Sequence, residues 1–313
     1  MTRIGVVFPG QGSQALGMGV DVANHSTAAS DLFDMAQTVL GYDLLGLQRH
    51  GPEERLRETQ YSQPAIFVSN VAIFAALELP PESLIVSAGH SFAEYCSLYA
   101  AQSIGFEDAL RVVNARGIAM QRAAELAAGG MSAVLGMDAS DIRRVVDDVR
   151  AQTGLRVQLA NFNSPAQIVI SGDLRGVQAA GEALMAAGAK RVVPLNVSGA
   201  WHSALMEPAL EHFTHVVEAA PFTLPRFDVV SNVDAQPYRD VATIKKNLVL
   251  SVTHEVRWHE TAERLVSYGL DLIIECGASP VLGPLIKRLP GAPEVVVVSD
   301  FAGAQKLRNA VTA

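Results

Sequence analysis

The stretch AGHSFAEYC contains a serine whose setting suits a nucleophile. Gly89, His90 and Ser91 follow a short apolar run and precede a helical pattern. A turn of this kind lifts the serine hydroxyl out of a sheet, and the first N–H groups of the helix face a developing oxyanion. The full pattern is Gly-x-Ser-x-Gly, but Ala93 stands at the second glycine. Alone, the stretch fits a nucleophile elbow and an ordinary turn with a serine N-cap about equally.

A serine hydroxyl needs a base, and the chain has eight histidines. His90 is adjacent to Ser91 in sequence, so its ring would reach the hydroxyl with difficulty. His202 lies in NVSGAWHSALMEPA, a loop before an expected helix, where a side chain can face a cleft. Spacing alone leaves His202 as one candidate among several, and no aspartate stands out as its orienting partner.

Two other segments offer chemistry. In FPGQGSQ, Gly10 and Gly12 let the backbone bend and expose the Gln11 N–H as an oxyanion donor, beside that of Phe92. A phosphate loop is the alternative, but the Lys-Ser/Thr pair of that motif is missing. Arg116 lies on an amphipathic helix and is either a solvated surface residue or a bidentate clamp for a substrate carboxylate.

The composition limits the function classes. The 313 residues are 49% hydrophobic and 18% charged, with a net charge of −8, which argues against broad nucleic-acid binding. The two cysteines, Cys96 and Cys276, lack metal-ligand spacing and predict no disulfide framework. The N-terminus lacks a signal-peptide pattern, and no apolar run is long enough to cross a bilayer. We therefore expect a cytoplasmic protein without a metal site.

Short β-branched runs alternate with longer helical stretches, which is typical of a parallel-sheet α/β protein. Strands are expected at 4–8, at 84–88, in FDVVSNVD, in LDLIIECGA and in EVVVVSD. Ser62 and Pro64 mark a helix start, and further helices are expected from about 92 to 101 and over 106–127.

A different order occupies residues 131 to about 194. It reads strand, helix, strand, strand, helix, strand, which is the ferredoxin-like unit, with AAGG as the linker before it. We therefore predict a large α/β-hydrolase-like parallel-sheet domain, residues 1–128 and 196–313, with an inserted ferredoxin-like small domain, residues 129–195.

Several motifs occur in a fixed order from Phe8 to Arg288: FPGQGSQ, GHSFAEY, RGIAMQ, ANFNSPAQIVISG, VSGAWHSALM, VSNVDAQP, VRW and GASPVLGPLIKR. Together they resemble the malonyl-CoA:acyl carrier protein transacylases over nearly the whole chain. The segment NVSGAWHS is most similar to the stand-alone acyltransferases that serve polyketide synthases in trans.

The resemblance implies a ping-pong reaction with malonyl-CoA and an acyl carrier protein, or a polyketide synthase carrier domain, as partners. Ser91 would attack the thioester with His202 as general base, and the N–H groups of Gln11 and Phe92 would hold the oxyanion. The carrier protein's phosphopantetheine thiol would then accept the malonyl group. The resemblance implies no bound cofactor, and it favours a monomer.

The same resemblance assigns the remaining site residues. Arg116 would pair with the malonyl carboxylate, and His90, Met120 and Trp201 would line the substrate site. The backbone carbonyl of Ser251, where the family usually has glutamine, would orient the general base.

Three departures from the family pattern bear on this assignment. Ala93 replaces a glycine, Trp201 replaces the usual phenylalanine, and Glu255 replaces a common proline. The larger ring of Trp201 should favour unsubstituted malonyl, although a rotated indole would reshape the pocket instead.

Three alternatives remain open at this point: an editing acyl hydrolase acting on carrier proteins, a transferase of non-malonyl acyl groups between carrier proteins, and a non-catalytic binding subunit. Basic residues that would suit an acidic carrier protein are Lys190, Arg191, Lys287, Arg288, Lys306 and Arg308. The sequence names neither the receiving carrier protein nor the choice between fatty-acid and polyketide supply.

Overall fold

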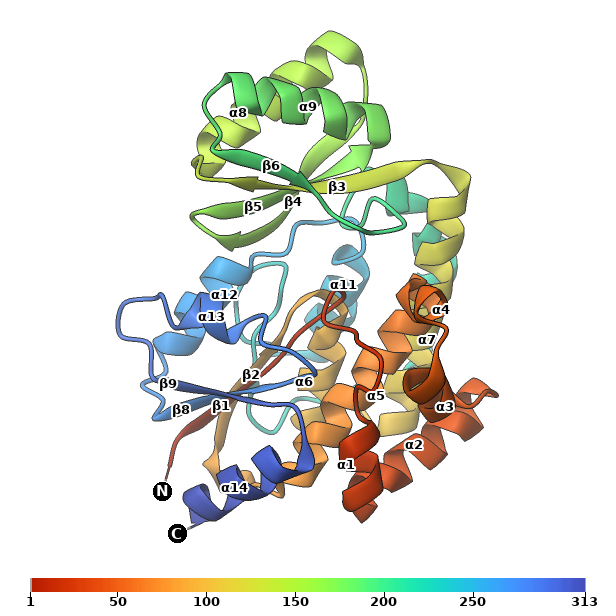
Figure 1. Cartoon of the computed structure of the whole chain (residues 1–313), viewed down its shortest axis with the longest axis vertical. Coiled ribbons are helices and arrows are strands. Elements are labelled where there is room, and N and C mark those ends of the chain that lie inside the picture. The colour runs from red at the N-terminus through yellow and green to blue at the C-terminus, as the bar shows by residue number, and fades with distance from the viewer. Residues whose placement is uncertain (1, 313) are drawn as a thin grey trace.

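A computed structural model describes residues 2–312 of the chain. Two separate sheets organise it, a parallel sheet in the lower part of Figure 1 and an antiparallel sheet in the upper part. The predicted fold class, a parallel-sheet α/β domain with a separate antiparallel unit, is therefore confirmed. The exact division at residues 128/129 and 195/196 stays a prediction.

The large sheet has five parallel strands in the order β7-β2-β1-β8-β9. Every residue of its central strand β1 is buried, which explains the unbroken apolar run IGVVF. The strands are β1 (Ile4–Phe8), β2 (Leu84–Gly89), β7 (Asp228–Val229), β8 (Leu272–Cys276) and β9 (Glu294–Val298).

The strand expected over FDVVSNVD is shorter than its β-rich sequence suggests. Only Asp228 and Val229 are in register with β2; Val230 N still donates to the Ser87 carbonyl of β2 at 2.9 Å, and Val230 also bridges Pro237 within a local turn. Two residues further on, the Asn232 side chain bonds to the Gly89 carbonyl at the end of β2.

The small sheet has four antiparallel strands in the order β4-β5-β3-β6, which is the ferredoxin-like arrangement. Helices α8 and α9 cover its outer face (Figure 1). In chain order the elements are β3 (Gly129–Leu135), α8 (Ala139–Thr153), β4 (Val157–Ser164), β5 (Gln167–Asp173), α9 (Leu174–Ala186) and β6 (Arg191–Pro194).

The prediction of a linker at AAGG was wrong in part, because Gly129 and Gly130 already belong to strand β3. A Cβ atom on Gly129 would lie 2.6 Å from the Cβ of Ala200. Glycine here therefore allows the strand to approach the loop before His202, and it is not a sign of chain flexibility.

Helices surround the large sheet, and the four nearest the N-terminus had no counterpart in the sequence prediction. The helices of this domain are α1 (Val20–His25), α2 (Thr27–Leu40), α3 (Leu44–His50), α4 (Glu53–Arg57), α5 (Thr59–Leu77), α6 (Glu94–Ala100), α7 (Phe106–Leu126), α10 (Leu210–Ala219), α11 (Val241–Leu250), α12 (Trp258–Val266), α13 (Gly283–Ile286) and α14 (Phe301–Thr312). Short 3₁₀ helices occur at η1 (Pro81–Ser83), η2 (Ser91–Ala93) and η3 (Ala204–Ala209).

Helix α5 begins at Thr59, so the predicted start at Ser62 and Pro64 was wrong. Pro64 lies inside the helix and forfeits one main-chain hydrogen bond. The helix is buried over most of its length, and this packing outweighs the local loss.

Helix α7 packs closely on α5 and carries Arg116 and Met120 one turn apart on its buried side. A Cβ atom on Gly117 would lie 2.9 Å from the Thr59 carbonyl oxygen, so glycine allows this close contact. The arginine therefore enters the protein interior from a helix that packs closely on α5 at the adjacent Gly117.

The site elements meet at the carboxyl edge of the parallel sheet. Phe8 pairs with Gly89 at the ends of β1 and β2, so the turns after these strands lie side by side. Polar residues in such turns share the crevice outside the strand ends. Within residues 2–312, no helix is both long and apolar enough to cross a membrane.

We predict that Gly89→Ala disrupts this edge. The new Cβ atom would lie 2.0 Å from the Ala93 carbonyl oxygen, so the turn must shift. Chemical denaturation should show a free energy of unfolding lower by about 1–3 kcal/mol, the usual cost of overpacking. Gly105→Ala is the control, because its Cβ atom meets nothing within 4 Å. Equal stability of the two variants would contradict the prediction.

Candidate active site

Ser91 is held in a strained backbone conformation at the start of η2. Its φ of 56° lies in the left-handed region that residues other than glycine rarely adopt. The Asn232 side chain holds the turn, accepting from the Ser91 N–H at 3.1 Å and donating to the Gly89 carbonyl at 2.9 Å. This is the geometry of a nucleophile elbow, with the serine hydroxyl projecting from the strand end.

The Ser91 hydroxyl lies against a histidine ring that comes from the other side of the cleft. Ser91 Oγ and His202 Nε2 are 2.7 Å apart. His202 Nδ1 lies 2.7 Å from the Ser251 carbonyl oxygen and 3.1 Å from that of His254. Carbonyl oxygens only accept, so Nδ1 carries the proton and Nε2 accepts from the serine hydroxyl. The imidazole is thus fixed in the tautomer that a general base requires.

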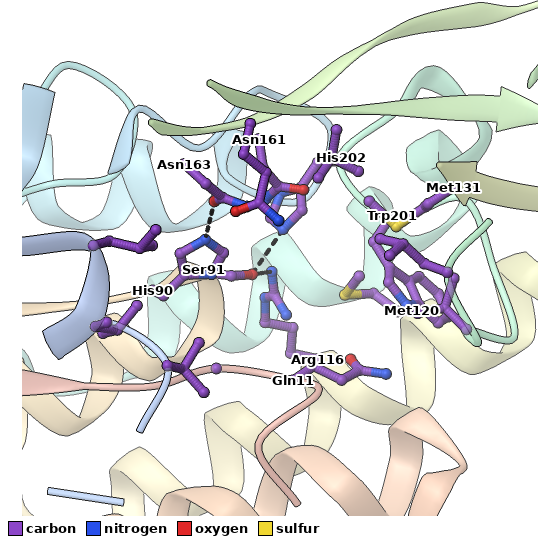
Figure 2. A pocket seen from close by; sticks show the side chains of 18 of the residues that line it. Gln11, His90, Ser91, Arg116, Met120, Met131, Asn161, Asn163, Trp201 and His202 are labelled. Atoms are coloured by element: carbon purple, nitrogen blue, oxygen red, sulfur yellow. Dashed lines mark hydrogen bonds between the residues drawn. The ribbon is translucent and has the colours of Figure 1, made fainter. Parts of the chain in front are cut away.

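The electrostatic surroundings keep His202 neutral. Burial, the positive charge of Arg116 and the neighbouring His90 together lower its pKa to about 3, against the two backbone acceptors that raise it. Burial also lowers the pKa of His90, whose Nε2 lies 3.0 Å from Asn163 Oδ1. His90 therefore points away from the serine and toward the small sheet (Figure 2).

Arg116 is only 1% exposed, and none of the ion pairs among the described residues includes it. Its Nη1 donates to Gln63 Oε1 at 2.9 Å and its Nη2 to Ser91 Oγ at 3.5 Å, whereas its Nε has no partner. Burial lowers the pKa of Arg116 to about 10, against the negative fields of Tyr95 and Glu94. A buried guanidinium in this state is ready for an anionic ligand.

A chain of side-chain hydrogen bonds links Arg116 to the turn after β1. Gln63 bonds Arg116 and also donates to Thr59 Oγ1 at 3.0 Å, and Thr59 donates to Gln11 Oε1 at 3.0 Å. Gln11 lines the cleft together with Ser91, and Phe92 follows the serine in η2. The first N–H groups of a helix lack partners within the helix, so this corner suits an oxyanion.

The cleft has a volume of about 410 Å³ and lies between the two sheets. Figure 2 shows Trp201 beside Met120 and Met131, on the opposite side from His90. The Trp201 ring packs on Gly199, where a Cβ atom would lie 2.6 Å from the indole. The residues at the cleft thus form an apolar end and a polar end that contains Ser91.

The sequence prediction missed the residues that support the elbow. Glu94 is fully buried, bonds to Asn232 and Tyr238, and has a pKa raised by burial. Asn232 and Tyr238 lie 141 or more positions after Ser91, so no local pattern connects them to it. Gln63 was also missed, although its one-turn spacing from Thr59 on a buried helix was a usable signal.

The structure also describes the surroundings of the two cysteines and of the possible metal ligands. Among residues 2–312, no group of three or more His, Cys, Asp or Glu side chains is placed to hold a metal ion. Cys96 and Cys276 are free and buried, and burial raises the pKa of both thiols.

Comparison with known proteins identifies the family. The acyl transferase domain family matches residues 6–290. The chain belongs to this family. This acyl transferase is 39% identical over 300 residues to the malonyl CoA-acyl carrier protein transacylase of Bacillus subtilis, covering 96% of this chain and 94% of that protein. It is 38% identical to the Escherichia coli K12 protein of the same name, covering 92% and 93%.

Solved structures give the same result. A malonyl-transacylase of a type II polyketide synthase, in complex with its acyl carrier protein, is 38% identical with a TM-score of 0.92, over 99% of this acyl transferase and all of that chain. The acyl carrier protein S-malonyltransferase of Vibrio cholerae is 38% identical with a TM-score of 0.91, covering 98% and 100%. The resemblance predicted from the motifs is confirmed.

The depressed pKa of His202 predicts an unusual pH profile. His202 should stay neutral, and so able to accept a proton, until the pH falls far below 6.5. Ser91 should therefore react with phenylmethylsulfonyl fluoride with the same rate constant at every pH between 8 and about 5. Mass spectrometry of samples quenched at successive times measures this rate constant. Arg116→Ala should move the acid limb to higher pH, because one cause of the lowered pKa is removed. A wild-type limb centred near pH 6.5 would contradict this prediction.

Proposed function

We propose that this acyl transferase moves a malonyl group from malonyl-CoA to the phosphopantetheine thiol of an acyl carrier protein through an ester on Ser91. One observation carries the proposal: a hydrogen-bonded Ser91–His202 pair lies beside the buried, carboxylate-free guanidinium of Arg116. The named activity of the relatives points to the same reaction.

In the first half-reaction, Ser91 Oγ bonds to the thioester carbonyl carbon while its proton passes to His202 Nε2. The backbone N–H groups of Gln11 and Phe92 donate to the resulting oxyanion. When the intermediate collapses, the carbon–sulfur bond breaks, and His202 returns the proton to the departing CoA thiolate. The enzyme then carries a malonyl ester on Ser91, and free CoA leaves.

The second half-reaction runs the same steps toward a different acceptor. The carrier protein's thiol gives its proton to His202, and its sulfur bonds to the ester carbonyl carbon. The carbon–oxygen bond to Ser91 then breaks, and His202 reprotonates the serine. Both halves need a base that is neutral at the start, which agrees with the depressed pKa of His202.

Arg116 selects the acyl group in this proposal. A malonyl ester on Ser91 has its free carboxylate near the guanidinium, whose Nη2 already lies 3.5 Å from Ser91 Oγ. An acetyl group, a plain acyl chain or a chain stalled on a carrier protein would leave the guanidinium buried and unpaired. This argues against the editing hydrolase and against transfer of non-malonyl groups. The hydrogen-bonded Ser91–His202 pair argues against the non-catalytic alternative, because a binding subunit needs no such pair.

Substituents on the malonyl group would meet the apolar end of the cleft. Met120, Met131 and Trp201 lie there, and the indole folds onto Gly199. We still expect a preference for unsubstituted malonyl. His90 lies at the opposite end of the cleft.

We also expect the protein to be a cytoplasmic monomer that supplies either fatty-acid or polyketide synthesis.

An acidic carrier protein would need basic residues near the cleft mouth. Lys287 and Arg288 follow α13 and are exposed, and Leu285 of that helix lines the cleft. Of the basic residues named from the sequence, we propose these two as docking contacts.

Incubation with malonyl-CoA alone should leave a malonyl ester on the wild-type protein and release one equivalent of CoA. Ser91→Ala should form no ester, because the attacking oxygen is absent. Intact-protein mass spectrometry with peptide mapping makes the measurement, and Ser97→Ala is a matched control, since Ser97 is a buried serine in α6. A malonyl adduct on Ser91→Ala would overturn the assignment.

Arg116→Ala should change which acyl group is loaded. Loss of a charge-assisted, two-point contact of ~3 kcal/mol predicts that the ratio of malonyl to acetyl loading falls roughly a hundredfold. The measurement is the loading rate of Ser91 from each acyl-CoA, followed by mass. Arg122→Ala is the control, because Arg122 is exposed on the same helix. An unchanged ratio in Arg116→Ala would remove this residue from the selection of malonyl.

A further inference from the structure

Gln158 lies in strand β4 of the small sheet, at the junction with the large domain, and the mechanism above does not use it. Its side chain is half-buried and reaches two segments of the large domain that are far apart in sequence. It does not line the substrate cleft, but it lines two hollows behind the histidine loop.

The carboxamide of Gln158 makes three hydrogen bonds to backbone groups. Its Nε2 donates to the carbonyl oxygen of His202 at 3.1 Å and to that of Thr253 at 3.3 Å. Its Oε1 accepts from the Ala204 N–H at 3.2 Å. Both amide protons and one acceptor site are therefore used, and all three partners are main-chain atoms.

These contacts join the two halves of the general-base arrangement. His202 lies in the loop that carries the imidazole, and Ala204 begins η3 directly after that loop. Thr253 lies between Ser251 and His254, whose carbonyl oxygens hold Nδ1 of that imidazole. The Gln158 side chain thus holds the backbone of His202 next to the segment 251–254, whose carbonyl oxygens orient the imidazole.

The histidine loop needs such a restraint. His202 has a φ of 58°, a left-handed conformation that a non-glycine residue keeps only when its surroundings enforce it. Strand β4 is a firm anchor for this purpose, because its backbone also bonds to the large domain. Phe162 N donates to Val256 O at 2.9 Å, and Val256 N donates to Ala160 O at 2.8 Å.

We propose that Gln158 is a positioning residue for the general base, and that through it the small sheet sets the distance between His202 and Ser91. This inference rests on the proposed function for the role of His202 as base. It assigns to the small domain a part in the chemistry, in addition to covering the cleft.

The test uses phenylmethylsulfonyl fluoride as well as malonyl-CoA. With the sulfonyl fluoride, Ser91 Oγ bonds to sulfur, fluoride leaves, and His202 takes the serine proton, so the rate reports the Ser91–His202 pair without binding of a malonyl carboxylate or CoA. Gln158→Ala should lower this rate constant about ten- to a hundredfold, the usual result of a small misplacement of a catalytic group. The KM for malonyl-CoA should stay near the wild-type value, because Gln158 does not line the cleft.

Gln158→Glu separates positioning from general structural support. The introduced carboxyl keeps an acceptor for the Ala204 N–H, but when ionised it has no proton to donate to the two carbonyl oxygens. When protonated at lower pH, it can donate one hydrogen bond again. The two facing carbonyl oxygens favour the protonated carboxyl and raise its pKa above the ordinary value. The rate of this variant should therefore recover in part as the pH falls from 8 to 5, a change that neither the wild type nor Gln158→Ala should show.

Gln178→Ala is the matched control, an exposed glutamine of the small domain whose side chain bonds only to Glu182. The proposal is overturned if Gln158→Ala reacts like the wild type, if its loss equals the fall in the folded fraction measured by circular dichroism, or if Gln178→Ala loses the same activity. A wild-type protein that takes no malonyl from malonyl-CoA, yet shows sulfonylation that depends on Gln158, would refute the proposed function and support this inference.

Discussion

The buried charge of Arg116 is the constraint on which the rest of the site depends. A guanidinium that is 1% exposed, without a carboxylate partner, is costly to the folded protein. Two neighbouring side chains offset part of this cost, because Gln63 accepts a hydrogen bond from one guanidinium nitrogen and Ser91 from another. The positive charge of Arg116 also contributes to the low pKa of His202. A ligand that brings a carboxylate would relieve the charge, which connects substrate choice to the stability of the site.

The two catalytic side chains share a second constraint, which is backbone strain. Ser91 and His202 both have positive φ values, and each is held by an amide side chain from a distant segment. Asn232 holds the serine turn from within the large domain, and Gln158 reaches the histidine loop from the small sheet. The reacting pair is therefore fixed by long-range contacts, and neither turn would keep this geometry as an isolated peptide.

The sequence predicted the fold class and the positions of the strands along the chain well, because buried parallel strands are continuous apolar runs and the ferredoxin-like unit has a distinct order of elements. It also named Ser91, His202, Arg116 and Gln11, which the structure brings to one cleft. Residues such as Asn232 and Gln158 were missed, since their partners, mostly main-chain atoms, lie far away in sequence. Main-chain groups are the same in almost every residue, so the sequence contains no residue type that marks such a partner. The start of α5 was misplaced for the opposite reason, because a local signal, Pro64, was overridden by burial.

The most direct test of the central claim is a high-resolution crystal structure of the enzyme loaded with malonyl on Ser91. The account predicts that both carboxylate oxygens of the malonyl group bond to the Arg116 guanidinium and that the ester carbonyl oxygen faces the N–H groups of Gln11 and Phe92. A malonyl carboxylate that points to solvent, with Arg116 still bonded only to protein atoms, would contradict it.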